Sequence, residues 1–389
     1  MTEHPLRKTP LPQFRSVLAA GFSALAGVAC VLIGSGAARA ESGLYAEYRD
    51  WVLGCDNVRS CRAISPKAAE ASGVALFVSR AGEGAARASV QLLVPVPEGL
   101  ALLQGGGIEL AVDGLSLGLL RDGREFRLSP DSNDGSRIGS VENDEITLAI
   151  LNAFRTSRTL TIRAPEGAPL GTVSLDGAAA AMLGMDERQA RLGTRGAIAR
   201  PGNRPDADVP APPALPTKPA PRRVQLLSAT ADLPSAVRRL ADEDVRADLC
   251  EEGAASRAGR TVARLNPTTT LFGLPCRVGY RADVTAFYLL DLNARPAHAK
   301  RLRLPQPQLS PKTADEAATA QHILTGDGFE AATGDLGGIS MDYSPECGTF
   351  GHWRWTGSTF VLTSYERSPA ACRGLGDHAS LVIYRSAGE

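Results

Sequence analysis

The chain has 389 residues with 42 basic and 42 acidic side chains, so its formal net charge is zero. A neutral chain offers no general basic face for nucleic acid or for an anionic membrane, so the sequence favours neither class of partner. Its length is enough for two domains of ordinary size.

Residues 1–40 have the features of a secretory signal. Three basic residues before position 16 precede an uncharged run at 17–38 that is rich in Ala, Gly, Leu and Val. Small residues at Ala38 and Ala40 occupy the two positions that a signal peptidase reads, which predicts cleavage after Ala40. An uncleaved anchor is the alternative, because the run is just long enough to span a bilayer. After Ala40 no long apolar run remains, so we expect a periplasmic or secreted chain without a transmembrane span.

Cleavage would remove Cys30 and leave an even number of cysteines: Cys55, Cys61, Cys250, Cys276, Cys347 and Cys372. In an exported protein an even count favours three disulfides. A zinc site is disfavoured for the first two, because no histidine or further cysteine lies near them in the sequence. We expect these two to pair with each other. The last four allow three pairings, of which the sequential one is favoured because each pair then brackets a compact stretch.

Residues 41–195 are predicted to form a first, β-rich domain. Period-two alternation predicts strands at 74–80, 89–97, 107–114 and 159–164, separated by glycine-rich turns. One helix is predicted over 143–154, behind a cap at Asn143 or Asp144. Another is predicted from residue 176 to a point near Gly193.

A proline-rich segment at 196–223 is predicted to link this domain to a second one at 224–389. Residues 200–221 carry eight prolines and no aromatic residue, so we expect them to be extended and solvated. The second domain is predicted to begin with a helix at 233–250, capped by Asp232. Strands are then expected at 261–265, 286–292, 301–304, 352–357, 358–367 and 380–385. The fold class is therefore α+β and mainly β, with two antiparallel β-sandwich or barrel-like domains.

Several stretches resemble known families. The segments YRDWVLGCDNVRSCRA, LLVPVPEGLALLQGGGIELAVDG, EITLAILNAF and GTVSLDGAAAAMLGMDE resemble the invasion-associated locus B family of secreted bacterial proteins. The segments LFGLPCRVGY, GFEAATGDLGGIS, CGTFGHWRWTGSTFVLTSYE and ACRGL resemble the exported family catalogued as domain of unknown function 1176, whose members carry both halves. The resemblance implies an exported location and a two-part architecture, and it supplies no catalytic residue. The cysteine pair that usually precedes the EITLAILNAF helix is missing here, so a role in invasion is not carried over.

Motifs for catalysis, cofactors or metals are not found. The four histidines after Ala40 are not at metal-ligand spacing, and no nucleophile elbow, P-loop or dinucleotide fingerprint occurs. The best catalytic constellation would be Asp342, Glu346 and His352, for which solvated loop side chains are the plainer interpretation. In the loop at 131–142, Asp131, Asn133 and Glu142 fall at the first, third and twelfth positions of an EF-hand. The motif requires Asp or Asn at its fifth position and Gly at its sixth, but Gly135 and Ser136 stand there. We therefore expect no cofactor and no metal.

The stretch GHWRWTG is the most unusual one. In a strand, Trp353 and Trp355 share one face while His352 and Arg354 share the other. Exposed together, the two indoles would make a ligand or partner platform, so these four residues are the candidate binding surface. Buried together they are core, which we favour because Phe360 in the next strand can pack against them.

Taken together, the sequence favours an exported envelope protein that binds an envelope or secreted partner and does not catalyse a reaction. A periplasmic hydrolase with an unrecognised site is the alternative, and an inhibitor of a secreted enzyme would be a special case of binding. We expect the linker to let the two domains move independently.

Limited proteolysis tests the division into two domains. Because residues 200–221 have little apolar surface, a protease should cut there first and leave two resistant fragments. Mass spectrometry of the earliest fragments identifies the site. A first cut inside either predicted domain, with the linker intact, would contradict the division.

Overall fold

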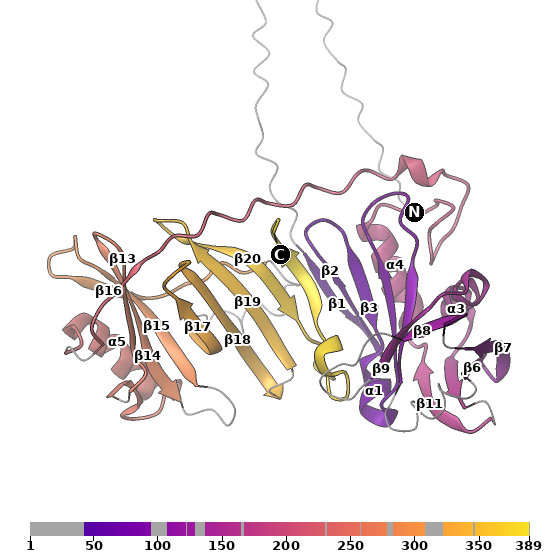
Figure 1. Ribbon diagram of the computed structural model, residues 1–389, viewed down its shortest axis with the longest axis horizontal. Coiled ribbons are helices and arrows are strands. Elements are labelled where there is room, and N and C mark those ends of the chain that lie inside the picture. Colours follow the sequence, from indigo (N-terminus) through magenta and orange to yellow (C-terminus); the bar gives the residue numbers. More distant parts are fainter. Residues whose placement is uncertain are drawn as a thin grey trace, which may run out of the picture. The chain divides into compact units, whose positions relative to one another are not determined.

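Three antiparallel sheets form most of the described structure (Figure 1). This computed structural model describes residues 43–94, 107–121, 123–128, 137–164, 167–229, 232–256, 258–277, 283–307, 322–344 and 347–388. The predicted signal and the EF-hand-like positions from Asp131 to Ser136 lie outside these residues. The mainly β, antiparallel architecture expected from the sequence is confirmed.

Two of the sheets are formed by residues that precede the proline-rich segment. The seven-stranded sheet has the order β1 (Leu44–Tyr48), β2 (Trp51–Cys55), β3 (Cys61–Ile64), β4 (Ala75–Arg80), β5 (Ser89–Val94), β9 (Arg137–Val141) and β8 (Phe126–Leu128). The four-stranded sheet has the order β11 (Pro169–Ser174), β10 (Thr159–Arg163), β6 (Ile108–Val112) and β7 (Leu115–Leu120). Three α-helices accompany these sheets, namely α1 (Pro66–Ser72), α3 (Asp144–Thr156) and α4 (Ala178–Arg188).

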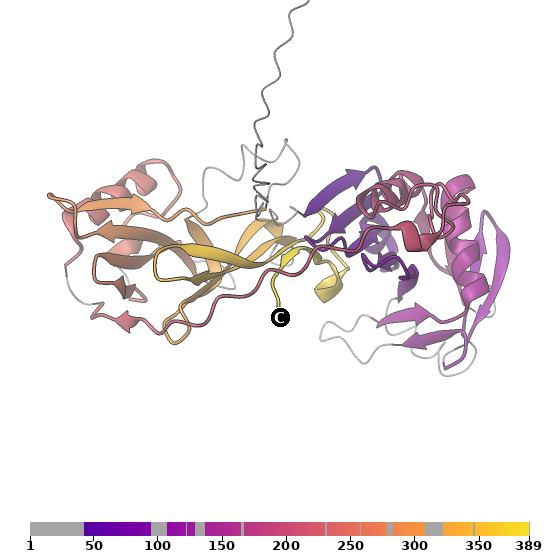
Figure 2. The ribbon, with the colours of Figure 1, turned by 90° about the horizontal axis from the view of Figure 1, so that it is seen from above.

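The third sheet is formed by the residues that follow. Its path is β12 (Gln225–Leu226), β13 (Thr261–Asn266), β14 (Thr269–Arg277), β15 (Val284–Asp291), β17 (Ile323–Glu330), β18 (Asp335–Ser344), β19 (Cys347–Trp355), β20 (Phe360–Arg367) and β21 (Leu381–Arg385), and β16 (His298–Arg301) pairs with β15. The helix α5 (Ser235–Arg246) lies on one face of this sheet (Figure 2). Short 3-10 turns lie at Asp206–Asp208, Ala254–Ser256 and Gly376–His378.

Trp51 anchors the core of the first half. Its side chain is fully buried and meets the ring of Phe154 from α3 edge to face, at 5.2 Å between ring centroids. The indole N–H donates to the carbonyl of Ser174, 2.9 Å away, so the polar atom of the ring is satisfied inside the core. The expected cap of α3 is confirmed, because the side chain of Asn143 accepts from the N–H of Ile146 at 2.9 Å.

The strands β2 and β4 are buried on both faces. In β2, Trp51 and Leu53 belong to the core of the first half, whereas Val52 packs in a second cluster together with Leu381 and Ile383 of β21. Gly54 gives β21 room, since a Cβ there would lie 2.7 Å from the Cβ of Leu381. The half-buried alternation expected at 74–80 therefore does not describe β4, because the second half covers its other face.

The loop closed by the Cys55–Cys61 disulfide is hydrogen-bonded to the C-terminal strand. Asp56 accepts from two backbone N–H groups of its own loop and from Nε of Arg385, the last at 2.6 Å. Asn57 accepts from the backbone N–H of Arg385 at 2.9 Å and donates to its carbonyl at 3.1 Å. Both side chains are buried, so the disulfide loop satisfies its polar groups on the end of β21.

The proline-rich segment makes hydrogen bonds at both of its ends. Near its start, the guanidinium of Arg204 donates to the carbonyls of Ala190 and Leu192. Near its end, the backbone N–H of Arg222 donates to the carbonyl of Thr333 at 2.9 Å, and the carbonyl of Pro216 accepts from the N–H of Ala387 at 2.8 Å. That the two halves separate at this segment stays a prediction, which the proteolysis experiment tests.

Several element boundaries differ from those expected. The helix α5 begins at Ser235 and its cap is Pro234, not Asp232, because the carbonyl of Pro234 accepts from the N–H groups of Val237 and Arg238 in the first turn. The helix α4 ends at Arg188, five residues before Gly193, since the following segment turns back through hydrogen bonds to that helix. The strand expected at 301–304 is β16, which lies earlier and ends at Arg301.

Replacing Trp355 tests how the second half is held together. The indole is 2% exposed, lies 5.2 Å from the ring of Phe360 and donates to the carbonyl of Leu265. Trp355→Ala should lower the free energy of unfolding by about 3–5 kcal/mol, measured by denaturant titration, because a large cavity replaces a buried ring. His352→Ala is the matched control, because this exposed neighbour should change stability by less than about 0.5 kcal/mol. Equal stabilities of the two variants would contradict the assignment of Trp355 to the core.

Candidate functional site

The helix α5 carries chemistry on both of its faces. Its inner face buries Val237, Leu240 and Ala241 against β14, β15 and β16, at the spacing of one helical stripe. Beyond its end, Cys250 is bonded to Cys276 of β14, so the covalent link holds the chain that leaves the helix. The helix is thereby fixed to the sheet along its length.

Asp244 lies on the same inner stripe and is completely buried. Its Oδ2 accepts from the hydroxyl of Tyr288 at 2.6 Å and lies 2.9 Å from Nε2 of His322. Its Oδ1 accepts from Nε of Arg301 at 2.8 Å, and Arg301 also reaches the carboxylate of Glu243 at 3.2 Å. One carboxylate therefore ties α5 to β15, to β16 and to the residue before β17.

The surroundings of Asp244 set its charge state. Burial disfavours the carboxylate, but the hydrogen bonds from His322, Tyr288 and Arg301 outweigh it and hold the pKa of Asp244 below its ordinary value. The pKa of Tyr288 is raised, first by burial and then by its hydrogen bond to this anion. The cluster is therefore stable with Asp244 ionised and the phenol neutral.

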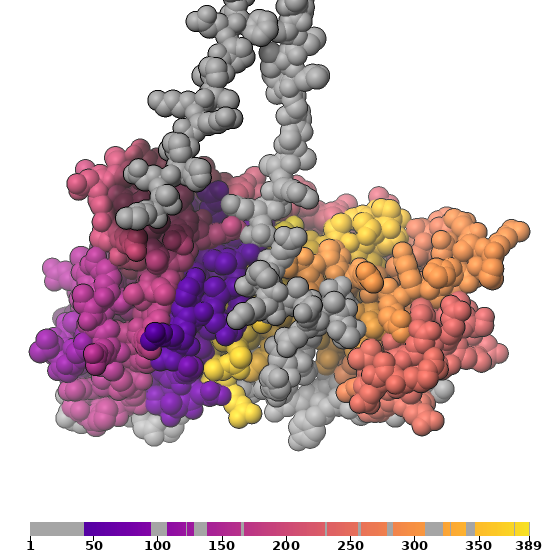
Figure 3. All heavy atoms as spheres, turned by 180° about the vertical axis from the view of Figure 1, so that it is seen from behind, coloured from indigo at the N-terminus to yellow at the C-terminus, as the bar shows by residue number. Residues whose placement is uncertain are grey.

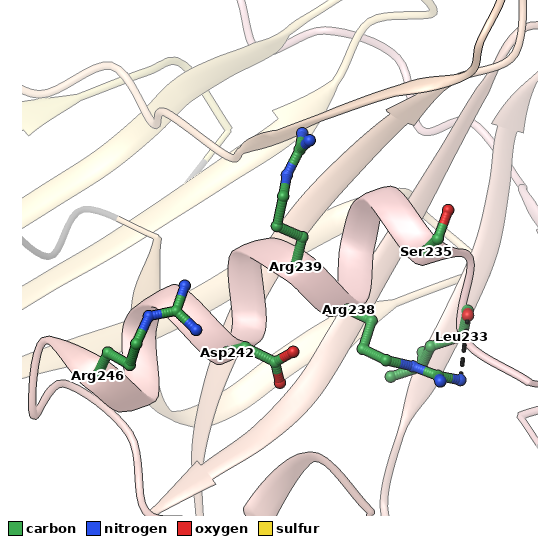
Figure 4. Close-up of a pocket in the computed structure, with 6 residues that line it drawn as sticks. All are labelled: Leu233, Ser235, Arg238, Arg239, Asp242 and Arg246. Carbon is green, nitrogen blue, oxygen red and sulfur yellow. Dashed lines mark hydrogen bonds between the residues drawn. The ribbon is translucent and has the colours of Figure 1, made fainter.

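The outer face of α5 is a shallow hollow rich in arginine. Six residues line this α5 hollow, namely Leu233, Ser235, Arg238, Arg239, Asp242 and Arg246, and its volume is about 260 Å³ (Figure 4). The three guanidinium groups and the Asp242 carboxylate are exposed, and the surface that contains α5 appears in salmon in Figure 3. Arg238 donates to the carbonyl of Leu233 at 3.5 Å, while the carboxylates that pair with Arg301 are those of Glu243 and Asp244. The hollow therefore presents more positive than negative charge to solvent.

The two faces differ in what they can do. The His322 and Asp244 side chains are 4% and 0% exposed, so this pair holds the helix and is shielded from solvent. The arginines on the outer face can donate hydrogen bonds to an anionic group from outside. The arrangement is that of a binding surface on a rigid support.

The residues of the stretch GHWRWTG are brought together, but only His352 has an exposed side chain. Trp353 and Trp355 are each 2% exposed, which agrees with the packing interpretation. Arg354 forms two bonds of 2.6 Å to the carboxylate of Asp335 on β18 and donates to the carbonyl of Pro219 in the linker. Arg354 thus holds the linker to the sheet, and a binding role for the four residues stays a prediction.

The remaining candidates divide into two groups. All three expected disulfides are present: Cys55–Cys61, Cys250–Cys276 and Cys347–Cys372. The constellation of Asp342, Glu346 and His352 stays untested, because the Asp342 side chain and Glu346 lie outside the described residues. In the described part, acidic, histidine and cysteine side chains do not gather into a group suited to a metal ion.

The sequence contained one signal for α5 that was not used. Asp244 follows Val237, Leu240 and Ala241 on the apolar stripe of the predicted helix. A carboxylate on a buried stripe requires polar partners, which predicts a cluster such as the one observed. Those partners come from segments up to 78 residues away, so the sequence of the helix alone could not identify them.

Comparisons with known proteins place the chain among uncharacterised ones. The family model described as Protein of unknown function (DUF1176) matches residues 45–385. The chain is similar to the uncharacterized protein YpfG of Escherichia coli (strain K12), with 24% identity over 338 residues, or 83% of this chain and 87% of the relative. It is also similar to the crystal structure of invasion associated protein B from Bartonella henselae, with 22% identity and a TM-score of 0.26 over 38% of this chain and 98% of that chain. None of the described helices is long and apolar enough to cross a membrane.

Replacing Asp244 tests the role of the buried cluster. Asp244→Asn removes the charge and should lower the free energy of unfolding at neutral pH by about 2–3 kcal/mol, because charged hydrogen bonds are lost in a buried place. Since the pKa of Asp244 is lower when folded than when unfolded, its contribution is complete above the unfolded value and is lost as the pH falls through the folded value. Denaturant titrations at neutral and acid pH should therefore show a smaller acid loss in the variant.

Glu243→Gln is the matched control for this experiment. Glu243 contacts the same Arg301 but is 39% exposed, so its removal should cost less than about 1 kcal/mol. Equal losses from the two substitutions would contradict a special role of Asp244.

Proposed function

The chain belongs to the family described as Protein of unknown function, and on that premise we propose that it is an exported, non-catalytic envelope protein that binds a partner through the α5 hollow. The partner is an envelope or secreted molecule with an anionic group. The observation that carries the proposal is the set of three exposed arginines on a helix whose opposite face is locked by Asp244. A rigid support lowers the entropy lost on binding, so it favours recognition by these side chains.

Export is supported by the three disulfides together with the signal features of residues 1–40. Disulfides persist in oxidising compartments, of which the periplasm is one. We place the mature chain, from Glu41 onward, in the periplasm or outside the cell. There the α5 hollow would face envelope components.

Affinity capture tests the binding function. The mature chain should retain a partner from an envelope extract, and the triple variant Arg238→Gln, Arg239→Gln and Arg246→Gln should retain several-fold less, because it has lost the three positive charges of the hollow. Quantitative mass spectrometry measures the retained partner.

A matched control separates the hollow from net charge. Arg121→Gln, Arg195→Gln and Arg200→Gln remove the same charge from exposed positions outside the hollow and should retain the partner as the unmodified chain does. Equal retention by both triple variants would remove the hollow from the proposal.

Hydrolysis is the second candidate, and the pair of His322 and Asp244 is the observation that favours it. A histidine held 2.9 Å from a carboxylate is a common arrangement for a general base. We place it second because catalysis needs His322 to reach a substrate, and its side chain is buried. Hydrolysis of chromogenic ester or peptide substrates that disappears in His322→Ala, with the fold retained, would reverse this order.

A further inference from the structure

We propose that the α5 hollow binds a phosphate group, carried either by a lipid headgroup or by a soluble phosphate ester. This inference rests on the proposed function and names the chemistry of the ligand. It begins with the arrangement of the charges. Arg238, Asp242 and Arg246 follow one another at i, i+4 spacing along the helix, and the side chain of Arg239 points away from those of Arg238 and Asp242 (Figure 4).

The balance of charge in the hollow suits a phosphate. Three guanidinium groups against one carboxylate leave two positive charges, which match the charge of about −1.5 to −2 on a phosphate monoester at neutral pH. A carboxylate ligand would carry half of that charge or slightly more. A phosphate also offers three acceptor oxygens, so more than one arginine can donate to it at once.

The arginines are available for such a ligand. Glu243 and Asp244 are directed to Arg301, which leaves Asp242 as the acid of the hollow. Arg238 has one weak bond, to a backbone carbonyl at 3.5 Å. In the described part of the chain, Arg239 and Arg246 are not engaged by a carboxylate. A ligand therefore need not displace an internal ion pair before it binds.

The size of the hollow limits how much of the ligand it holds. Its volume of about 260 Å³ lies below the range of roughly 300–1,000 Å³ that is typical of pockets enclosing a whole small molecule. The hollow accommodates the phosphate and the atoms next to it, while the rest of the ligand extends into solvent. That geometry fits the headgroup of a lipid in a bilayer and a soluble phosphate ester equally well.

Asp242 provides a test that distinguishes a binding site from a merely structural helix, namely the effect of its charge on the affinity for phosphate. Its negative charge opposes a bare anion, and its oxygens can accept a hydroxyl next to the phosphate. Asp242→Asn should therefore strengthen the binding of inorganic phosphate, because it removes the negative charge and keeps a polar side chain of the same size.

The binding experiment uses the mature chain and two probes. Calorimetric titration with inorganic phosphate measures the free anion. Co-sedimentation measures binding to vesicles of equal parts phosphatidic acid, whose headgroup is a phosphate monoester, and phosphatidylcholine against vesicles of phosphatidylcholine alone. We expect binding in at least one of the two, weakened by about tenfold or more in the Arg238, Arg239 and Arg246 triple variant, since a charge-assisted pair worth 1.4 kcal/mol is a factor of ten. Added salt should weaken it as well.

The same measurements include the matched control and distinguish the two possible carriers of the phosphate, a lipid headgroup and a soluble ester. The Arg121, Arg195 and Arg200 triple variant should bind as the unmodified chain does, and all variants should keep the same melting temperature. Vesicle binding that inorganic phosphate displaces supports a lipid headgroup. Binding of phosphate without vesicle binding supports a soluble ester.

Two outcomes would overturn the inference, and they differ in what they say of the proposed function. If neither probe binds but the captured partner still depends on the three arginines, the phosphate chemistry is wrong and the binding function stands. If the hollow variant equals the control variant with both probes and in partner capture, both are wrong.

Discussion

The burial of β2 and β4 on both faces is the constraint on which the first half depends. A strand with one buried face alternates apolar and polar residues, whereas these strands place side chains in two different clusters. One cluster is the core around Trp51, and the other is shared with β20 and β21. Shifting either strand by one residue would exchange the two sets. The register of the sheet is therefore fixed from both sides, by residues that are more than 300 positions apart in the sequence.

Local sequence patterns predicted helices and strands well where residues close in sequence determine the structure. The helix behind Asn143, the strands at 74–80 and 159–164 and the parity of the cysteines all follow from short-range rules. Strand β18 was missed because glycines at Gly337 and Gly338 interrupt the apolar pattern. Gly338 is required because a Cβ there would lie 2.6 Å from the side chain of Leu324, which is a tertiary contact.

The candidate site was harder to predict than the fold. Indoles at two-residue spacing attracted attention, but Gly351 leaves the space into which the Trp353 ring turns, and both rings are buried. The arginines of α5 lie on a predicted helix, where exposed charged side chains are ordinary and do not by themselves indicate a site. A formal net charge of zero also conceals them, because it averages a local excess of guanidinium groups with acids elsewhere. What distinguishes this face is the helix beneath it, which is held by Tyr288, His322 and Arg301 from distant segments.

Asn57 has a consequence for how the molecule behaves at high concentration. The strand β21 ends the path of the third sheet, and the outer strand of a sheet exposes backbone groups that can pair with another chain. At Arg385 both of these groups are taken by the side-chain amide of Asn57, which imitates a neighbouring backbone. The disulfide loop thus blocks this end of the sheet edge. It thereby disfavours the edge-to-edge pairing of molecules that leads to aggregation.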